Sequence, residues 1–308
     1  MQALTGYVTI GVLILVGVLC AQIGVLNTSH QKMLSKVALL VSSPALMLMI
    51  MSRADMSHVF ARSVLATGGA IVGAAFVYVA AALLFFRPKP ADRTIGMFLS
   101  CYTNAGNLGL PVATYALGDA AWIAPVLLMQ LAILQPLGMA HLDYCKARES
   151  GGAVPLAKLL TLPVRNPLTV GVLAGLTLNL LHISVPTILA TPLDMLGGIA
   201  VPAMLLAFGV SLRLDPRPKK TAESTESNVL VVIKCLLQPL MAYTLARFAF
   251  GLPLATVRAV TIIAALPPAQ NVYIFAMRYG VRELFARNTI FRATATSAVV
   301  IGLLAALL

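Results

Sequence analysis

Asn104-Ala105-Gly106-Asn107-Leu108-Gly109-Leu110-Pro111 lies in the middle of a long apolar stretch, and Leu266-Pro267-Pro268-Ala269-Gln270-Asn271 interrupts a second one. Both segments combine helix-breaking residues with amide side chains. A broken helix in a bilayer leaves backbone N–H and C=O groups without partners, so it persists only where protein or a water-filled cavity covers it. Breaks at corresponding positions in two halves of a membrane chain mark the midplane binding site of secondary transporters.

The composition indicates that lipid surrounds most of the chain. Hydrophobic residues make up 59% of the 308 residues, charged residues only 10%, and the mean hydropathy is +0.92. Soluble domains carry about a quarter charged residues. Spans of about 20 residues leave room for roughly ten helices, so we predict an all-α integral membrane protein. The predicted spans are 5–25, 34–52, 60–86, 94–116, 121–144, 165–182, 190–211, 229–250, 255–278 and 289–308.

The distribution of basic residues predicts the orientation. Seventeen of the 22 Lys and Arg residues fall in connections that follow odd-numbered spans. The opposite side holds Arg53, Arg62, Arg247 and Arg258, while Lys234 falls inside the eighth span, from which we expect it to snorkel to the basic face. Because basic loops stay in the cytoplasm, both termini are predicted on the non-cytoplasmic side. The net charge of +12 is thus an orientation signal, and we expect no nucleic-acid partner.

The two halves of the chain resemble each other. The segment 15–19 matches 173–177, and Pro44-Ala-Leu-Met-Leu48 matches Pro202-Ala-Met-Leu-Leu206 at the same offset of 158 residues. A repeat of five spans cannot return to its starting side, so the second copy runs inverted. We therefore predict a five-plus-five inverted repeat in which broken spans four and nine cross. The first repeat covers 1–144, a cytoplasmic connection 145–164, and the second repeat 165–308, with a cytoplasmic linker at 212–228.

The two broken segments supply the chemistry of an uncharged polar site. Each interior Gly lowers helix propensity by about 1 kcal/mol, and Pro removes a backbone donor, so each helix is expected to stop and restart. A restarted half-helix presents a positive dipole end, and neither segment contains Asp or Glu. This pattern favours a small organic anion; the plainer alternative is a pair of kinks with amides joining helices. The candidate substrate-binding residues are Asn104, Gly106, Asn107, Gly109, Pro111, Pro267, Pro268, Gln270 and Asn271.

Other kinds of site lack a sequence signature. Cys20, Cys101, Cys145 and Cys235 have no metal-ligand spacing and are interpreted as small packing residues. No nucleophile with a base and no cluster of acids is evident. We expect no catalytic residue, no metal and no cofactor, and an enzyme is disfavoured.

The motifs resemble those of one family. NAGNLGLP at 104–111 with YALG at 115–118, PPAQN at 267–271 with RYG at 278–280, and the stretch 166–183 are similar to the auxin efflux carrier family. The family includes plant auxin exporters and bacterial permeases associated with malonate or malate. The resemblance implies a scaffold and a transport domain that moves like an elevator, spans four and nine crossing at the candidate residues, and a homodimer. The short linker 212–228 is typical of a compact bacterial member.

The sequence therefore predicts a secondary carrier of a small organic anion in the plasma membrane, the inner membrane of a bacterium. Malonate, malate and auxin-like acids are the expected substrate class. Two alternatives stay open: a ligand-sensing receptor that uses the same pocket, and an ion-coupled symporter. Substrate identity, direction and coupling ion stay open too.

Overall fold

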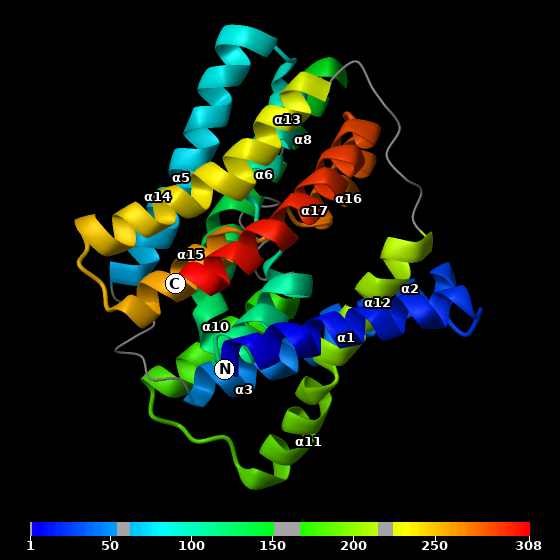
Figure 1. Cartoon of the computed structure of the whole chain (residues 1–308), viewed down its shortest axis with the longest axis vertical. Helices are drawn as coiled ribbons and strands as arrows, with labels where there is room; N and C mark the ends of the chain where they lie inside the picture. The colour runs from blue at the N-terminus through cyan, green and yellow to red at the C-terminus, as the bar shows by residue number, and fades with distance from the viewer. Residues whose placement is uncertain (1, 54–61, 151–166, 215–223) are drawn as a thin grey trace. The chain divides into compact units, whose positions relative to one another are not determined.

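The computed structural model describes residues 2–53, 62–150, 167–214 and 224–308, and every regular element in these ranges is a helix (Figure 1). The chain is an all-helical membrane protein. Six of the described helices are long and apolar enough to cross a bilayer: Thr28–Arg53, Arg62–Phe86, Ala120–Arg148, Thr187–Leu214, Thr225–Ala249 and Glu283–Leu307. They correspond to predicted spans two, three, five, seven, eight and ten.

The remaining predicted spans contain shorter apolar helices or broken ones. Gly11–Gln22 and Val170–Leu180 fall in spans one and six, and Leu254–Ala264 forms the first part of span nine. Two predicted connections are described only in part. Residues 151–164 of the connection 145–164, and residues 215–223 of the linker 212–228, lie outside the described residues.

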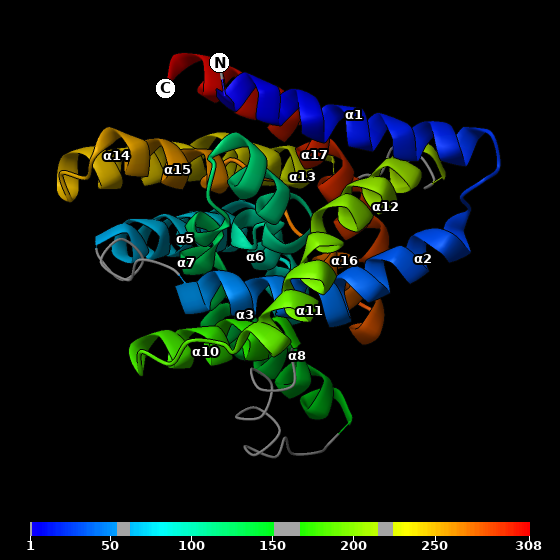
Figure 2. The same ribbon diagram turned by 90° about the horizontal axis from the view of Figure 1, so that it is seen from below.

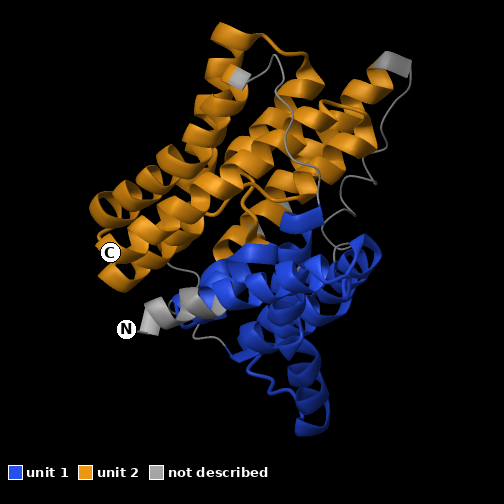
Figure 3. Cartoon of the chain, turned by 45° about the vertical axis from the view of Figure 1, so that its right-hand side comes forward, with its two compact units in different colours: residues 1–59, 106–124, 163–217 blue, residues 60–105, 125–162, 218–308 orange. Residues whose placement is uncertain are grey.

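The chain divides into two compact units, and each unit draws on both halves of the sequence (Figure 3). Unit 1 consists of Met1–Val59, Gly106–Ala124 and Pro163–Arg217, and unit 2 of Phe60–Ala105, Pro125–Leu162 and Pro218–Leu308. Spans one, two, six and seven therefore belong to unit 1. Span four is shared, because the division falls between Ala105 and Gly106.

Unit 1 is built by pairing helices from the two halves of the sequence. Its α-helices are α1 (Gln2–Gln22), α2 (Thr28–Val37), α3 (Ser43–Arg53), α10 (Pro167–Leu180), α11 (Thr187–Gly198) and α12 (Ala200–Leu214). It also contains the short segments η1 (Ala38–Ser42), η4 (Val112–Ala116) and η5 (Ala120–Ile123). The two main packing pairs are α1 with α12 and α3 with α10, the second of which is visible in Figure 2.

In both of these pairs, glycines allow the two helix backbones to approach closely. A Cβ added to Gly17 of α1 would overlap the carbonyl oxygen of Leu206 in α12, and one added to Gly175 of α10 would overlap the carbonyl oxygen of Leu48 in α3. Small residues at membrane-helix interfaces allow such close backbone approach. Gly17 and Gly175 are 158 residues apart (175 − 17), as are Leu48 and Leu206 (206 − 48). The two contacts thus match at the offset found in the sequence.

Unit 2 contains both breaks and the larger core cluster. Its α-helices are α5 (Arg62–Ala81), α6 (Pro90–Cys101), most of α7 (Ala124–Leu128), α8 (Gln135–Ser150), α13 (Ser224–Val232), α14 (Gln238–Thr244), α15 (Leu254–Ala264), α16 (Asn271–Tyr279) and α17 (Glu283–Leu307). α13 and α14 continue as one apolar helix, and α14 packs against α5 and α15 (Figure 1). Phe98, Leu99 and Tyr102 belong to the larger core cluster of the unit, together with Val272 and Phe275.

Wide π-helical turns accompany several prolines inside the spans. Pro44 follows η1, Pro136 follows η6 (Met129–Leu134), and Pro239 follows η8 (Ile233–Leu237). Pro111 lies between η3 (Ala105–Gly109) and η4. A proline ring clashes with the carbonyl four residues earlier and offers no N–H to it. A π turn shifts that carbonyl and leaves room for the ring, so these helices continue past their prolines.

Candidate functional site

Both predicted interruptions are present, and one lies earlier than expected. α6 ends at Cys101, residues 102–104 are extended, and the chain becomes helical again at Ala105. The expectation that the helix stops within 104–111 is thus wrong in position, because π turns around Pro111 accommodate the Gly and Pro residues within a helix. In the second segment α15 ends at Ala264 and α16 begins at Asn271, so Pro267 and Pro268 lie in the break as predicted.

The two breaks meet inside unit 2 as a short antiparallel pairing. Thr103 forms an isolated bridge with Pro268. The Asn104 N–H donates to the Pro267 carbonyl at 2.8 Å, and the Ala269 N–H donates to the Tyr102 carbonyl at 2.9 Å. These bonds satisfy backbone groups that the broken helices would otherwise leave unpaired. We call residues 102–104 and 265–270 the crossing.

Lys234 places an amine at this crossing. The side chain is 0% exposed, and its Nζ donates to Gln238 Oε1 at 2.7 Å, to the Ala264 carbonyl at 2.8 Å and to Thr103 Oγ1 at 3.1 Å. The expectation that Lys234 snorkels to the basic face is therefore wrong. The side chain finds three oxygen acceptors inside the unit, which offset part of the desolvation that snorkelling would avoid.

Two consecutive carbonyls at the end of α15 each accept a hydrogen bond from a side chain of another helix. Lys234 binds the Ala264 carbonyl, and the Ser297 hydroxyl of α17 donates to the Ala265 carbonyl at 2.5 Å. A cation is favoured at a helix C-terminus because the aligned peptide dipoles make that end negative. The interpretation of the site as uncharged must be corrected. Its neutral amides are accompanied by a lysine from span eight.

Aromatic side chains hold the first break in place. The Tyr102 hydroxyl donates to Gln135 Oε1 at 2.8 Å, and the Tyr102 ring lies edge-on to Phe98 and Phe275 with centroids 5.6 and 6.2 Å away. Edge-to-face pairs at such distances are favourable. The extended residues therefore sit on a rigid base.

The nine predicted site residues are divided between the two units. Asn104, Pro267 and Pro268 are buried within the crossing, while Gln270 and Asn271 are partly exposed beside it. Gly106, Asn107, Gly109 and Pro111 belong to unit 1. There Gly106 and Asn107 are partly exposed and Pro111 is buried. The structure thus brings Asn104 together with the Pro267–Pro268 break, and the substrate-binding role of the nine residues stays a prediction.

Sequence reasoning underrated Lys234, although a signal was available. Lys234 and Gln238 are four residues apart, so they share one face of a helix, and both are at most 1% exposed. A lysine with a polar residue at this spacing in an otherwise apolar span indicates a shared polar contact inside the bundle.

A second buried charged group joins three elements of unit 2. Arg282, just before α17, donates to Glu226 through Nη1 at 2.9 Å and Nη2 at 2.6 Å, and the Tyr78 hydroxyl donates to Glu226 Oε1 at 2.8 Å. The Arg282 guanidinium also stacks 3.6 Å from the centroid of the Phe285 ring. We call Tyr78, Glu226 and Arg282 the ion-pair cluster. Its connected donors and acceptors fix the ends of α5, α13 and α17 to one another.

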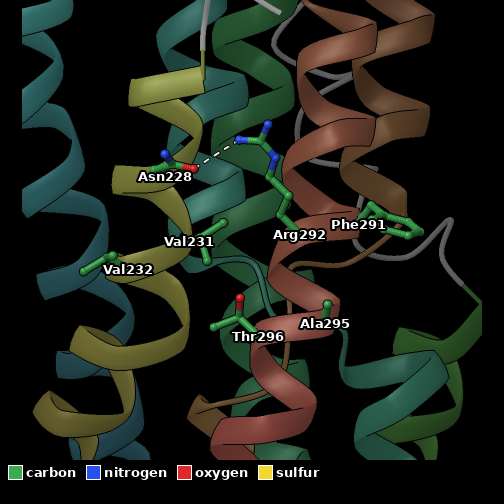
Figure 4. A pocket seen from close by; sticks show the side chains of 7 residues that line it. All are labelled: Asn228, Val231, Val232, Phe291, Arg292, Ala295 and Thr296. Carbon is green, nitrogen blue, oxygen red and sulfur yellow. Dashed lines mark hydrogen bonds between the residues drawn. The ribbon is translucent and has the colours of Figure 1, made fainter. Parts of the chain in front are cut away.

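A shallow groove of about 560 Å³ lies between α13 and α17 (Figure 4). Its walls are mostly apolar, and at one end Arg292 donates to Asn228 Oδ1 at 3.1 Å. The lining residues are Asn228, Val231, Val232, Phe291, Arg292, Ala295 and Thr296. None of the predicted site residues lines this groove.

Among the residues that the structure describes, no three His, Cys, Asp or Glu side chains gather into a cluster that would hold a metal ion. Of the cysteines, Cys101 and Cys235 are buried.

Two comparisons with known proteins give matches over most of the chain. A family model described as "Membrane transport protein" matches residues 3–143 and 153–304, which is nearly the whole chain. A protein of Rhizobium meliloti (strain 1021) named "Putative malonate transporter" is 28% identical over 268 residues, covering 85% of this chain and 82% of that protein.

Proposed function

Because the chain belongs to the membrane transport protein family, the auxin efflux carriers, and is therefore a transporter rather than an enzyme, we propose that it is a secondary carrier of a small organic anion. The observation that carries the proposal is the crossing itself. Two broken segments are hydrogen-bonded to each other inside one compact unit, with a lysine buried between them. An interrupted backbone within a membrane is costly, and secondary transporters use such interruptions to form their substrate sites.

Electrostatics supports an anion as the substrate. The N-terminus of α16 begins at Asn271, directly after the crossing, and a helix N-terminus attracts negative charge. Lys234 adds a basic group, and the sequence contains no Asp or Glu at 101–111 or 264–271. A cation substrate would lack a carboxylate partner there. The name of the R. meliloti relative directs the first choice of anion to malonate.

The proposed mechanism is alternating access of the elevator type. The crossing and its lysine lie in unit 2 and would travel with that unit, while unit 1 would serve as the scaffold. The matched contacts of Gly17 with Leu206 and of Gly175 with Leu48 support the inverted repeat that such carriers use. We extend the proposal to residues 1–144 and 165–308 as the two repeats, and to a homodimer formed through unit 1.

The proposed location is the bacterial inner membrane, with both termini on the non-cytoplasmic side. The support is the unequal distribution of Lys and Arg between connections of odd and even number. A reporter fused after Leu308 that is active only outside the cytoplasm tests this orientation.

The test of function is uptake of labelled malonate into liposomes that contain the purified protein. Gln270→Ala and Asn271→Ala, both in unit 2, should each lower the apparent affinity for malonate about ten- to a hundredfold, the loss expected for one hydrogen bond to a charged group. Asn228→Ala is the matched control, because Asn228 is exposed and bonded to Arg292. Normal uptake in both site variants would refute the site, and absence of uptake of malonate, malate and auxin-like acids by the unchanged protein would refute the substrate class.

A further inference from the structure

The surroundings of Lys234 Nζ have the composition of a cation site. The three oxygen atoms around Nζ, at 2.7–3.1 Å, come from the Thr103 hydroxyl, the Gln238 amide and the Ala264 carbonyl. These residues lie at the crossing, in α14 and at the end of α15, so three separate elements converge on one point. All of them belong to unit 2.

The chemistry of these oxygens suits a hard monovalent cation. Hydroxyl, amide and peptide carbonyl oxygens are neutral ligands for hard ions, and carbonyls at unwound segments and half-helix C-termini coordinate sodium in secondary transporters. The negative dipole end of α15 adds to the attraction. Divalent ions normally require carboxylates as well, and neither Asp nor Glu is present in the crossing segments.

We propose that Lys234 is a resident cation: its amine occupies an oxygen-lined site that would otherwise bind a small monovalent cation. The lysine is covalently part of the continuous helix α13–α14, so its amine occupies the site throughout the transport cycle, whichever salt is in solution. The helix breaks are therefore neutralised without a dissolved ion. This goes beyond the proposed function, since it concerns what holds the crossing together and would apply to any substrate.

The coordination of Nζ argues against the rival role, in which Lys234 binds the substrate directly. An ammonium has three N–H groups, and three acceptors already surround this one. Its side chain is also 0% exposed. A substrate carboxylate would have to displace one of these partners and reach a closed position.

Removal of the side chain should create a dissolved-ion site. In Lys234→Ala the three oxygens remain and the volume of the lysine side chain becomes free. Sodium should then bind and raise the melting temperature, because a ligand that binds only the folded state stabilises it. Lys234→Met is the matched control, since its unbranched side chain fills much of that volume and offers the oxygens no charge.

The experiment is thermal unfolding of the detergent-solubilised full chain in NaCl, KCl or choline chloride at equal ionic strength. We expect a saturable sodium- or potassium-specific rise of about 2 °C or more in Lys234→Ala. The unchanged protein and Lys234→Met should melt at the same temperature in all three salts. Because no substrate is added, the result is independent of whether the chain carries malonate.

Three results would overturn the proposal. One is an equal melting temperature of Lys234→Ala in all three salts, and another is a sodium-specific rise in the unchanged protein. If Lys234→Ala does not fold in choline, it is purified in NaCl, together with Lys234→Asn, whose side-chain oxygen adds a fourth ligand. Recovery of folded protein in NaCl but not in choline chloride supports the resident cation. The third overturning result is failure of both variants to fold in NaCl as well.

Discussion

Replacement of Glu226 by Gln breaks the ion-pair cluster while keeping the size of the side chain. The Glu226 carboxylate accepts two hydrogen bonds from Arg282 and one from Tyr78, at 2.6–2.9 Å. The glutamine amide has one oxygen in place of two and turns an N–H toward a donor. The Arg282 guanidinium, with only 9% of its side chain exposed, then loses the negative charge of Glu226.

The expected loss of unfolding free energy follows from this burial. Removing one partner from a buried ion pair costs about 3–5 kcal/mol, because the other charge remains buried. Tyr78→Phe removes one hydrogen bond to a charged group and keeps the pair, so its cost should be smaller, about 1.5–3 kcal/mol. Asp194→Asn breaks the pair between Arg53 and Asp194, whose side chains are 58% and 46% exposed. That loss should be within about 1 kcal/mol.

The assay is thermal or denaturant unfolding of the purified protein in one detergent, with the three variants compared side by side. The order of stability should be Asp194→Asn, then Tyr78→Phe, then Glu226→Gln as the least stable. Added salt should change the loss in Glu226→Gln little, since buried pairs are weakly screened. Equal stability of Glu226→Gln and Asp194→Asn would show that the cluster is solvated and that the reasoning from burial is wrong.

Two further predictions concern unit 1. Gly17→Ala and Gly175→Ala should each lower the free energy of unfolding by about 1–3 kcal/mol through overpacking, because the new methyl group overlaps a carbonyl of the facing helix. Gly11→Ala is the control, because a Cβ at that position has no atom within 4 Å. Equal melting temperatures of all three variants would contradict the close contacts. Asn179→Ala should lower stability by about 1–3 kcal/mol, because Asn179 Nδ2 donates at 3.0 Å to the carbonyls of both Met51 and Ser52, while Thr177→Ala loses only a bond within its own helix. If these two variants unfold alike, the contact between α10 and α3 contributes nothing.

Much of the architecture was predictable because the bilayer acts on each residue separately. A run of apolar side chains is stable in hydrocarbon whatever its neighbours are, so six of the predicted spans correspond to long apolar helices. The proline pair at 267–268 was also sufficient to locate the second break, since neither residue offers an N–H to a helix. Resemblance of the crossing motifs identified the family before any geometry was known, and the family model confirms it.

The first break was harder to locate, because π-helical turns can accommodate helix-breaking residues within a helix. Gly106, Gly109 and Pro111 lie in or between π-helical turns, and the chain is extended instead at 102–104, where no Gly or Pro occurs. Pairing with the Pro267–Pro268 segment provides the hydrogen bonds that make an extended backbone possible there. The position of the break thus depends on a partner about 165 residues away (268 − 103).

The sequence by itself determined that the chain is a helical membrane protein with two interrupted spans, because transfer to lipid and helix propensity are properties of local composition. Only the tertiary structure decided which groups the interruptions hold. Lys234 is bound by oxygens from residues 103, 238 and 264, and Arg282 by Glu226 from another helix. A buried polar group is stable only with a suitable partner, and the identity of that partner depends on how distant segments pack.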